Sequence, residues 1–63
     1  MKPHQERVVA EKAELDGRIE SLRAFIGGET FPHLDASERE RLRRQAYIMK
    51  ELSQVLGERI KAF

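Results

Sequence analysis

Apolar residues recur every three or four positions from Leu15 to Ile26, and Val8 lies one heptad before Leu15. Five of them follow heptad spacing: Val8, Leu15, Ile19, Leu22 and Ile26. This spacing places them along one side of a helix and does not fit a strand. Pro3 suits a first helical turn, where its missing N–H costs nothing. Gly27-Gly28 predicts a stop, because glycine accepts the left-handed conformation after a last turn. The pattern predicts a helix over about residues 3–26.

A connection is predicted over about residues 27–35. Pro32 lacks a donor and pushes Phe31 out of helical space, and we expect Phe31 and Leu34 to pack back against the closed end. The next helix begins at a capping box, formed either by Asp35 with Glu38 or by the Ser37 and Glu40 pair two residues later. It is predicted over about residues 36–62.

The second helix also carries a heptad pattern. Its apolar positions are Leu42, Met49, Leu52, Leu56 and Phe63. Gln45 and Arg59 fall in two further positions of the same row, and we call the row that each helix is expected to turn toward the other helix its seam. Two helices joined by a short link return antiparallel. We expect Leu15 opposite Ile48 or Met49, and Val8 opposite Val55 or Leu56. The predicted fold class is all-α: one antiparallel two-helix hairpin over residues 1–63.

More apolar residues are present than one seam can bury. Phe25, Ile48 and Val55 fall on one flank of the hairpin, and Val9 and Ile60 fall on the other. A two-helix hairpin has no third layer to cover them, and small chains that cannot close a core usually oligomerise. These five residues are the predicted interface of a helical-bundle homo-oligomer, of which two hairpins in a four-helix bundle are the minimal form.

Composition narrows the functional classes. The 63 residues include no cysteine, which excludes disulfides and thiolate chemistry, and no apolar run is long enough to span a membrane or to form a signal peptide. We therefore expect the cytosol. The net charge of +1 argues against a general nucleic-acid coat. No serine–histidine spacing, metal-ligand spacing or phosphate loop occurs, so we expect no enzyme, no metal and no cofactor.

Polar residues inside the predicted seams are the candidate site. Lys12 and Arg59 fall where apolar residues are expected, both toward the open end, and a cationic pocket there would accept an anion such as a phosphate. Buried polar residues also fix register and oligomer state, and long basic side chains also reach solvent past apolar neighbours. The sequence leaves these readings open. Gly17 and Gly57 are expected on the outer faces of the helices.

Two further features concern nucleotides. His4 lies near Arg7 at the start of the first helix, where a ring and a cation could sandwich a base. The run Arg39-Glu40-Arg41-Leu42-Arg43-Arg44 invites a nucleic-acid interpretation, but its arginines spread around the helix, and Glu38 and Glu40 are interleaved with them. A solvated or ion-paired face is favoured for this run.

The chain also resembles a known family over nearly its whole length. The resemblance rests on His4-Gln5-x-Arg7-Val8-Val9-x-Glu11-Lys12-x-Glu14-Leu15-Asp16-x-Arg18-Ile19-x-x-Leu22-x-x-Phe25-Ile26 and on Leu42-x-x-Gln45-x-x-x-Met49-x-x-x-Ser53-x-x-Leu56-x-x-Arg59-Ile60-x-x-Phe63. These patterns resemble very short phage-encoded proteins related to a crAss-like phage protein. Such hairpins are similar in form to the anti-CBASS and anti-Thoeris sponges, which sequester cyclic nucleotide or cyclic ADP-ribose signals of bacterial immunity.

The resemblance implies a phage anti-defence protein that holds such a signal in pockets between subunits, in the host cell cytosol. The ligand-binding residues come from the physical reading: Lys12, Arg59 and Arg7 for phosphates, and Gln5, Gln45 and His4 for base or ribose edges. Two alternatives from other classes stay open. One is a small helical adaptor that binds a host protein through the apolar flank of Phe25, Ile48 and Val55. The other is a nucleic-acid-binding hairpin that uses the arginine run.

Overall fold

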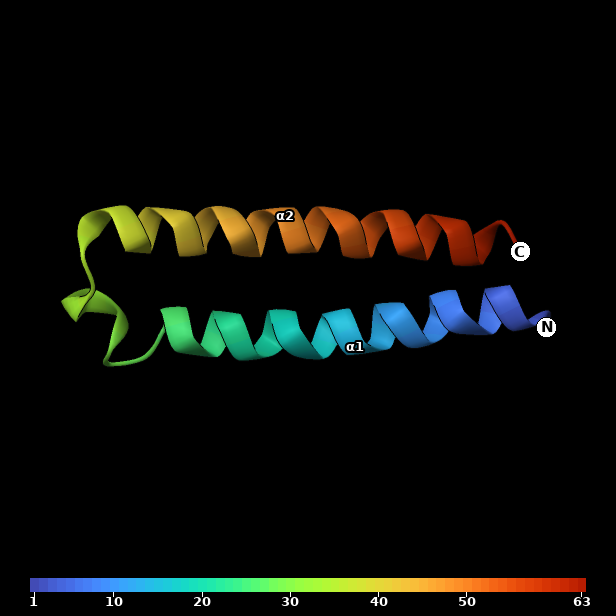
Figure 1. The fold of residues 1–63 in the computed structure, drawn as a ribbon, viewed down its shortest axis with the longest axis horizontal. Helices are drawn as coiled ribbons and strands as arrows, with labels where there is room; N and C mark the ends of the chain where they lie inside the picture. The colour runs from blue at the N-terminus through green and yellow to red at the C-terminus, as the bar shows by residue number, and fades with distance from the viewer.

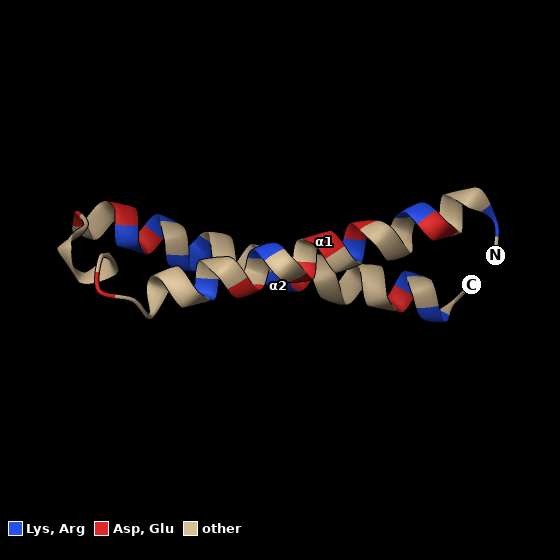
Figure 2. Cartoon of the chain, turned by 90° about the horizontal axis from the view of Figure 1, so that it is seen from below, with Lys and Arg blue, Asp and Glu red and all other residues tan.

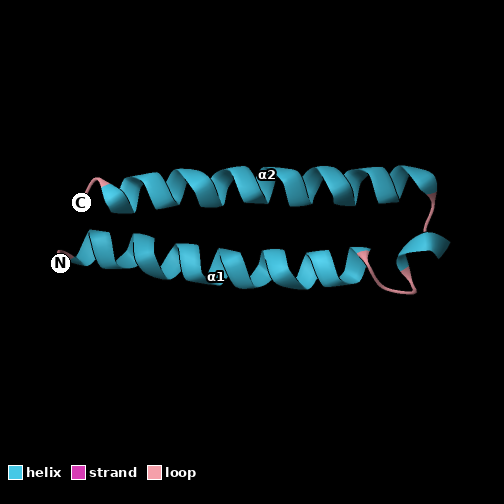
Figure 3. Cartoon of the chain, turned by 180° about the vertical axis from the view of Figure 1, so that it is seen from behind, coloured by secondary structure: helices cyan, strands magenta, loops and turns pink.

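Two long helices lie side by side and run in opposite directions. The computed structural model describes all residues, 1–63. Helix α1 (Pro3–Ile26) and helix α2 (Ala36–Lys61) are joined by a short 3₁₀ helix, η1 (Phe31–His33). Both termini lie at the same end of a rod with extents of 46 × 15 × 13 Å (Figure 1). The predicted all-α hairpin is confirmed, and helix occupies most of the chain (Figure 3).

The end of α1 depends on its two glycines in a way that the sequence did not predict. Gly27 caps the helix with φ −84° and ψ 0°, and no glycine in the chain has a positive φ. The expected left-handed conformation is therefore absent. Close approach favours glycine at position 28 instead, because a Cβ on Gly28 would lie 3.3 Å from the carbonyl oxygen of Ala24 and 3.4 Å from that of Phe25.

The connection folds back onto the helices, as expected from its apolar residues. The side chain of Phe31 is buried and that of Leu34 is half-buried. The guanidinium of Arg43 lies 5.1 Å from the centre of the Phe31 ring, a distance at which a cation is attracted to an aromatic face. Asp35 is the N-cap of α2, and its carboxylate accepts a hydrogen bond of 3.1 Å from the backbone N–H of Ser37.

The seam of α2 differs from the predicted one. Its buried and half-buried positions facing α1 are Leu42, Ala46, Met49, Ser53, Leu56 and Ile60. Four residues that were placed in the seam are exposed: Gln45, Leu52, Arg59 and Phe63. The physical reason is that α2 carries two heptad rows, each residue of one row directly preceding a residue of the other. The row that contains Ala46 and Ser53 faces α1, because these small side chains let the helices approach where larger ones would hold them apart.

The register between the helices also differs from the prediction. The expected pairing of Leu15 with Met49 would have put Asp16 near Ile48. Asp16 instead contacts Ser53, and Lys12 passes over Gly57, where a Cβ would lie 3.3 Å from Lys12 Cε. The residue of α2 opposite Asp16 thus lies five positions beyond the predicted one, which is about one and a half helical turns. Gly57 is half-buried beneath Lys12 and does not lie on the outer face, whereas Gly17 does have open space around it.

The core of the single hairpin is small. Only Val8, Phe31 and Leu56 are buried apolar residues. Burial within one chain therefore leaves much of its apolar surface in water.

The two helices cross at a shallow angle, and positive and negative residues are interleaved along both of them (Figure 2). No helix combines the length and apolar character needed to cross a membrane.

Candidate functional site

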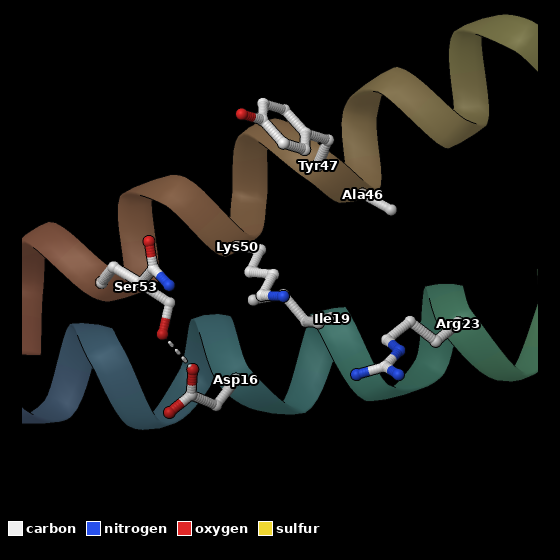
Figure 4. A pocket seen from close by; sticks show the side chains of 8 residues that line it. Asp16, Ile19, Arg23, Ala46, Tyr47, Lys50 and Ser53 are labelled. Atoms are coloured by element: carbon white, nitrogen blue, oxygen red, sulfur yellow. Dashed lines mark hydrogen bonds between the residues drawn. The ribbon is translucent and has the colours of Figure 1, made fainter.

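A groove of about 510 Å³ runs between the two helices on one side of the hairpin. Helix α1 contributes Asp16, Ile19 and Arg23. Helix α2 contributes the rest of the lining: Ala46, Tyr47, Lys50, Ser53 and Gln54 (Figure 4). We call this the α1–α2 groove. Its volume lies in the range of pockets that hold small molecules.

A polar contact closes one end of the α1–α2 groove. Ser53 Oγ donates a hydrogen bond of 2.5 Å to Asp16 Oδ1 (Figure 4), and Lys12 Nζ donates one of 2.8 Å to Asp16 Oδ2. The bond from Lys12 and then the bond from Ser53 lower the pKa of Asp16 below its ordinary value, against a smaller opposing effect of desolvation. Asp16 is therefore a carboxylate at neutral pH, and it can accept further hydrogen bonds at its remaining lone pairs.

Two cations face the same groove without a carboxylate partner. Arg23 and Lys50 make none of the three ion pairs in the chain, which join Lys12 to Asp16, Arg18 to Glu14 and Arg41 to Glu38. Their side chains extend from opposite helices toward the groove (Figure 4). Unpaired guanidinium and ammonium groups that converge from two elements can bind a phosphate through charge-assisted hydrogen bonds.

The groove also offers a ring and several hydrogen-bonding groups. Tyr47 is 64% exposed at its rim, so its ring is free to stack on a planar ligand. Gln54 supplies both an amide donor and an acceptor, and Asp16 supplies an acceptor. No group of histidine and acidic side chains that could hold a metal ion is present. The arrangement is suited to binding an anion that carries a planar ring.

The residues predicted from sequence lie elsewhere. Lys12 is half-buried, but its ammonium is held by Asp16. Arg59 is on the exposed surface of α2, and it lines neither groove of the chain. Gln5 Oε1 accepts a hydrogen bond of 2.9 Å from the backbone N–H of Lys2, which helps to begin α1. Gln45 is exposed and its amide points to the sulfur of Met49.

His4 and Arg7 are exposed near the open end, and the structure gives them no side-chain partner. A ligand role for these six residues remains a prediction from sequence. The predicted interface residues divide in a similar way. Phe25, Ile48, Val55 and Val9 are exposed, whereas Ile60 is half-buried against α1.

Sequence reasoning missed Arg23, Lys50, Tyr47 and Gln54. A signal for three of them exists in α2. Tyr47, Lys50 and Gln54 each follow directly after a seam residue, so they lie together about 100° around the helix from the seam. That signal becomes readable only when the seam itself is correctly assigned.

The arginine run is largely engaged within the chain. Arg39 Nη1 donates a hydrogen bond of 3.2 Å to the carbonyl oxygen of Pro32, and Arg41 pairs with Glu38. Arg43 stacks on Phe31. These contacts stabilise the closed end of the hairpin and leave Arg44 as the arginine of the run without a side-chain partner.

Comparison with known proteins gives one family. The family model described as Sequestin matches residues 2–62. No curated protein and no solved structure matches the chain.

Proposed function

This chain belongs to the Sequestin family, and we propose that it sequesters a small anionic ligand in the α1–α2 groove. The family name indicates that a ligand is withheld, which requires tight binding without turnover. The groove has the groups for binding a phosphate and a ring. In this proposal the chain is not an enzyme, and its activity is stoichiometric.

One observation carries the proposal. Arg23 and Lys50 extend from different helices into the same groove, and neither has an acidic partner. A cation on a helical surface is ordinarily solvated or paired with a nearby carboxylate. The charge in the groove would be neutralised by a bound anion, with Arg23 as a fork for two phosphate oxygens and Lys50 as a point charge.

The ligand in this proposal is a cyclic nucleotide or a cyclic ADP-ribose-type signal. Such molecules combine phosphate groups with a base and ribose hydroxyls. Arg23 and Lys50 bind the phosphates, Tyr47 stacks on the base, and Gln54 and Asp16 bind donor and acceptor edges. A phage-encoded hairpin of this kind acts in the host cytosol as an inhibitor of CBASS-type or Thoeris-type immune signalling.

Self-association is part of the proposal. The α1–α2 groove is open to solvent along one side, so one hairpin covers a ligand only partly. Enclosure between subunits requires another copy to lie over the groove, which would add a second set of Arg23, Lys50 and Tyr47 side chains to the ligand. Such a site gathers several cations although each chain has a net charge of only +1.

Isothermal titration calorimetry against a panel of cyclic dinucleotides and cyclic ADP-ribose isomers tests the proposal. We expect saturable heat from at least one member, with inorganic phosphate and a neutral nucleoside as controls that bind far more weakly. Chromatography of the ligand after release should recover it unchanged. No heat from any member of the panel would exclude this ligand class, and recovery of a converted product would exclude sequestration.

A further inference from the structure

Helix α2 carries a second heptad row that α1 does not cover. Its apolar members are Ile48, Leu52 and Val55, which are 57%, 44% and 49% exposed. Each of them directly precedes a residue of the buried seam, so the row lies about 100° around the helix from the contact with α1. Gln45 and Arg59 continue the row at its two ends. A helix with two heptad rows at this angle is typical of a bundle, where each helix contacts two neighbours.

Charged residues of α1 lie beside the exposed row of α2. A second groove, of about 200 Å³, is lined by Leu52 of α2 and by Leu15, Glu11, Glu14 and Arg18 of α1. This lining places Leu52 and Leu15 at the same level along the rod. We call this surface the Leu52 face. It shares no lining residue with the α1–α2 groove, which opens on the other side of the hairpin.

We infer that a second copy of this chain packs on the Leu52 face, antiparallel, about a two-fold axis through Leu52. This inference rests on the proposed self-association, and it identifies the surface through which two copies of the chain associate. The row on α2 is self-complementary about that residue. With Leu52 against its own copy, Ile48 meets Val55 of the second copy, and Gln45 meets Arg59 of the second copy. A two-fold interface requires this kind of match, because each residue and its partner exchange roles.

The charges on α1 match under the same axis. Leu15 lies at the level of the axis because it lines the groove beside Leu52. Arg18 is then on one side of the axis, and Glu11 and Glu14 are on the other side. Rotation brings Arg18 of one copy toward Glu11 and Glu14 of the other, twice in each dimer. Opposite charges flanking an apolar row select the partner and its orientation.

The size of the core favours a second copy as the occupant. Burial of Val8, Phe31 and Leu56 alone is a small core for a chain of 63 residues, and chains of this size usually need oligomerisation or a staple. The dimer covers Ile48, Leu52 and Val55 and forms a four-helix bundle. It leaves both copies of the α1–α2 groove on outer surfaces, so a ligand enclosed between subunits requires two dimers to meet across those grooves.

Cysteine cross-linking tests the assignment directly, because the chain has no cysteine of its own. Leu52→Cys places two thiols at the two-fold axis, whereas the control Tyr47→Cys places one thiol in the α1–α2 groove of each copy. Under mild oxidation at equal chain concentration, we expect Leu52→Cys to form a covalent dimer at least tenfold faster than Tyr47→Cys. Equal rates, or a faster Tyr47→Cys, would overturn the Leu52 face.

Sedimentation equilibrium separates this assignment from self-association itself. Without ligand, the wild-type chain should sediment at twice its mass of 7.3 kDa. Under the same conditions, Ile48→Glu should lower the mass toward the monomer, and Tyr47→Glu should leave it unchanged. A monomeric wild type would overturn both self-association and the Leu52 face, and would favour docking of a host helix there. A wild-type dimer that Ile48→Glu does not weaken would overturn the Leu52 face alone.

Exchanging the charges of Glu14 and Arg18 tests the alignment of the two α1 helices. Arginine and glutamate have similar helix propensities, so these variants should retain α1. Arg18→Glu should weaken the dimer at least tenfold, because three carboxylates then meet across the axis. Adding Glu14→Arg restores opposite charges both within one chain and between copies, and should recover most of the loss. If the double variant stays as weak as Arg18→Glu, the proposed alignment of the two α1 helices is wrong.

Discussion

Ser53 of α2 donates a hydrogen bond of 2.5 Å to Asp16 of α1, and this is the one side-chain hydrogen bond that joins the two helices. Asp16 is held on its other oxygen by Lys12. The contact fixes which residues of α2 stand opposite α1, and it forms part of the lining of the α1–α2 groove. Stability, register and the candidate site therefore depend on the same pair.

Ser53→Ala should lower the free energy of unfolding relative to a matched control. The control is Ser21→Ala, at an exposed position of α1, which gains the same helix propensity without losing a hydrogen bond. The difference between the two variants should be about 1 kcal/mol, the usual net contribution of such a bond. Urea unfolding followed by circular dichroism at equal chain concentration measures it. Equal stabilities would mean that water replaces the bond without cost.

Acidification should weaken the hairpin through Asp16. Its pKa is below the ordinary value of 3.8 in the folded chain, so the folded state binds fewer protons than the unfolded state near that pH. The contribution of Asp16 to stability is therefore complete well above the ordinary pKa of 3.8 and is lost as the pH falls through the lower pKa of the folded chain. Between about pH 5 and pH 2, where carboxyl groups titrate, the free energy of unfolding of the wild type should fall more steeply than that of Asp16→Asn. Parallel curves would show that Asp16 does not contribute.

The two glycines inside the helices should respond differently to alanine. A Cβ at Gly17 meets nothing within 4 Å, whereas a Cβ at Gly57 lies 3.3 Å from Lys12 Cε. Gly17→Ala should raise the free energy of unfolding by about 0.5–1 kcal/mol, the usual gain in a helix interior. Gly57→Ala should gain less, because the Lys12 stem must shift. Thermal melts compare the two, and a larger gain at Gly57 would contradict the close approach of Lys12.

Ligand affinity should depend on the groove cations more than on the cations predicted from sequence. Arg23→Ala and Lys50→Ala each remove one charge-assisted contact, and each should weaken binding of a cyclic nucleotide by roughly 10- to 100-fold, as expected for hydrogen bonds to charged groups. Arg59→Ala and Arg7→Ala remove the same charge from the exposed surface. Calorimetry on the four variants distinguishes the sites, and the opposite ranking would move the site to the open end.

The sequence by itself determined the local structure. Heptad spacing over Leu15, Ile19 and Leu22 predicts a helix because 3.6 residues complete a turn. The second helix was predicted to begin at Asp35 or two residues later at Ser37, and the structure has Asp35 as the N-cap. The glycine pair predicted the end of α1, although neither glycine has a left-handed backbone and the tight contact with preceding carbonyl groups is at Gly28. These features depend on neighbours within a few positions along the chain.

Only the tertiary structure decided which row of α2 faces α1. The row with Leu52 and the row with Ser53 have the same period, and side-chain size alone favours Leu52. Packing favours the other row, because small residues allow close approach of the helices and Asp16 satisfies the Ser53 hydroxyl at that distance. That choice places Leu52 outside, engages Lys12 and directs Lys50 into the groove beside Arg23. When two rows of one helix have the same period, only the residues of the opposite helix determine which row is buried.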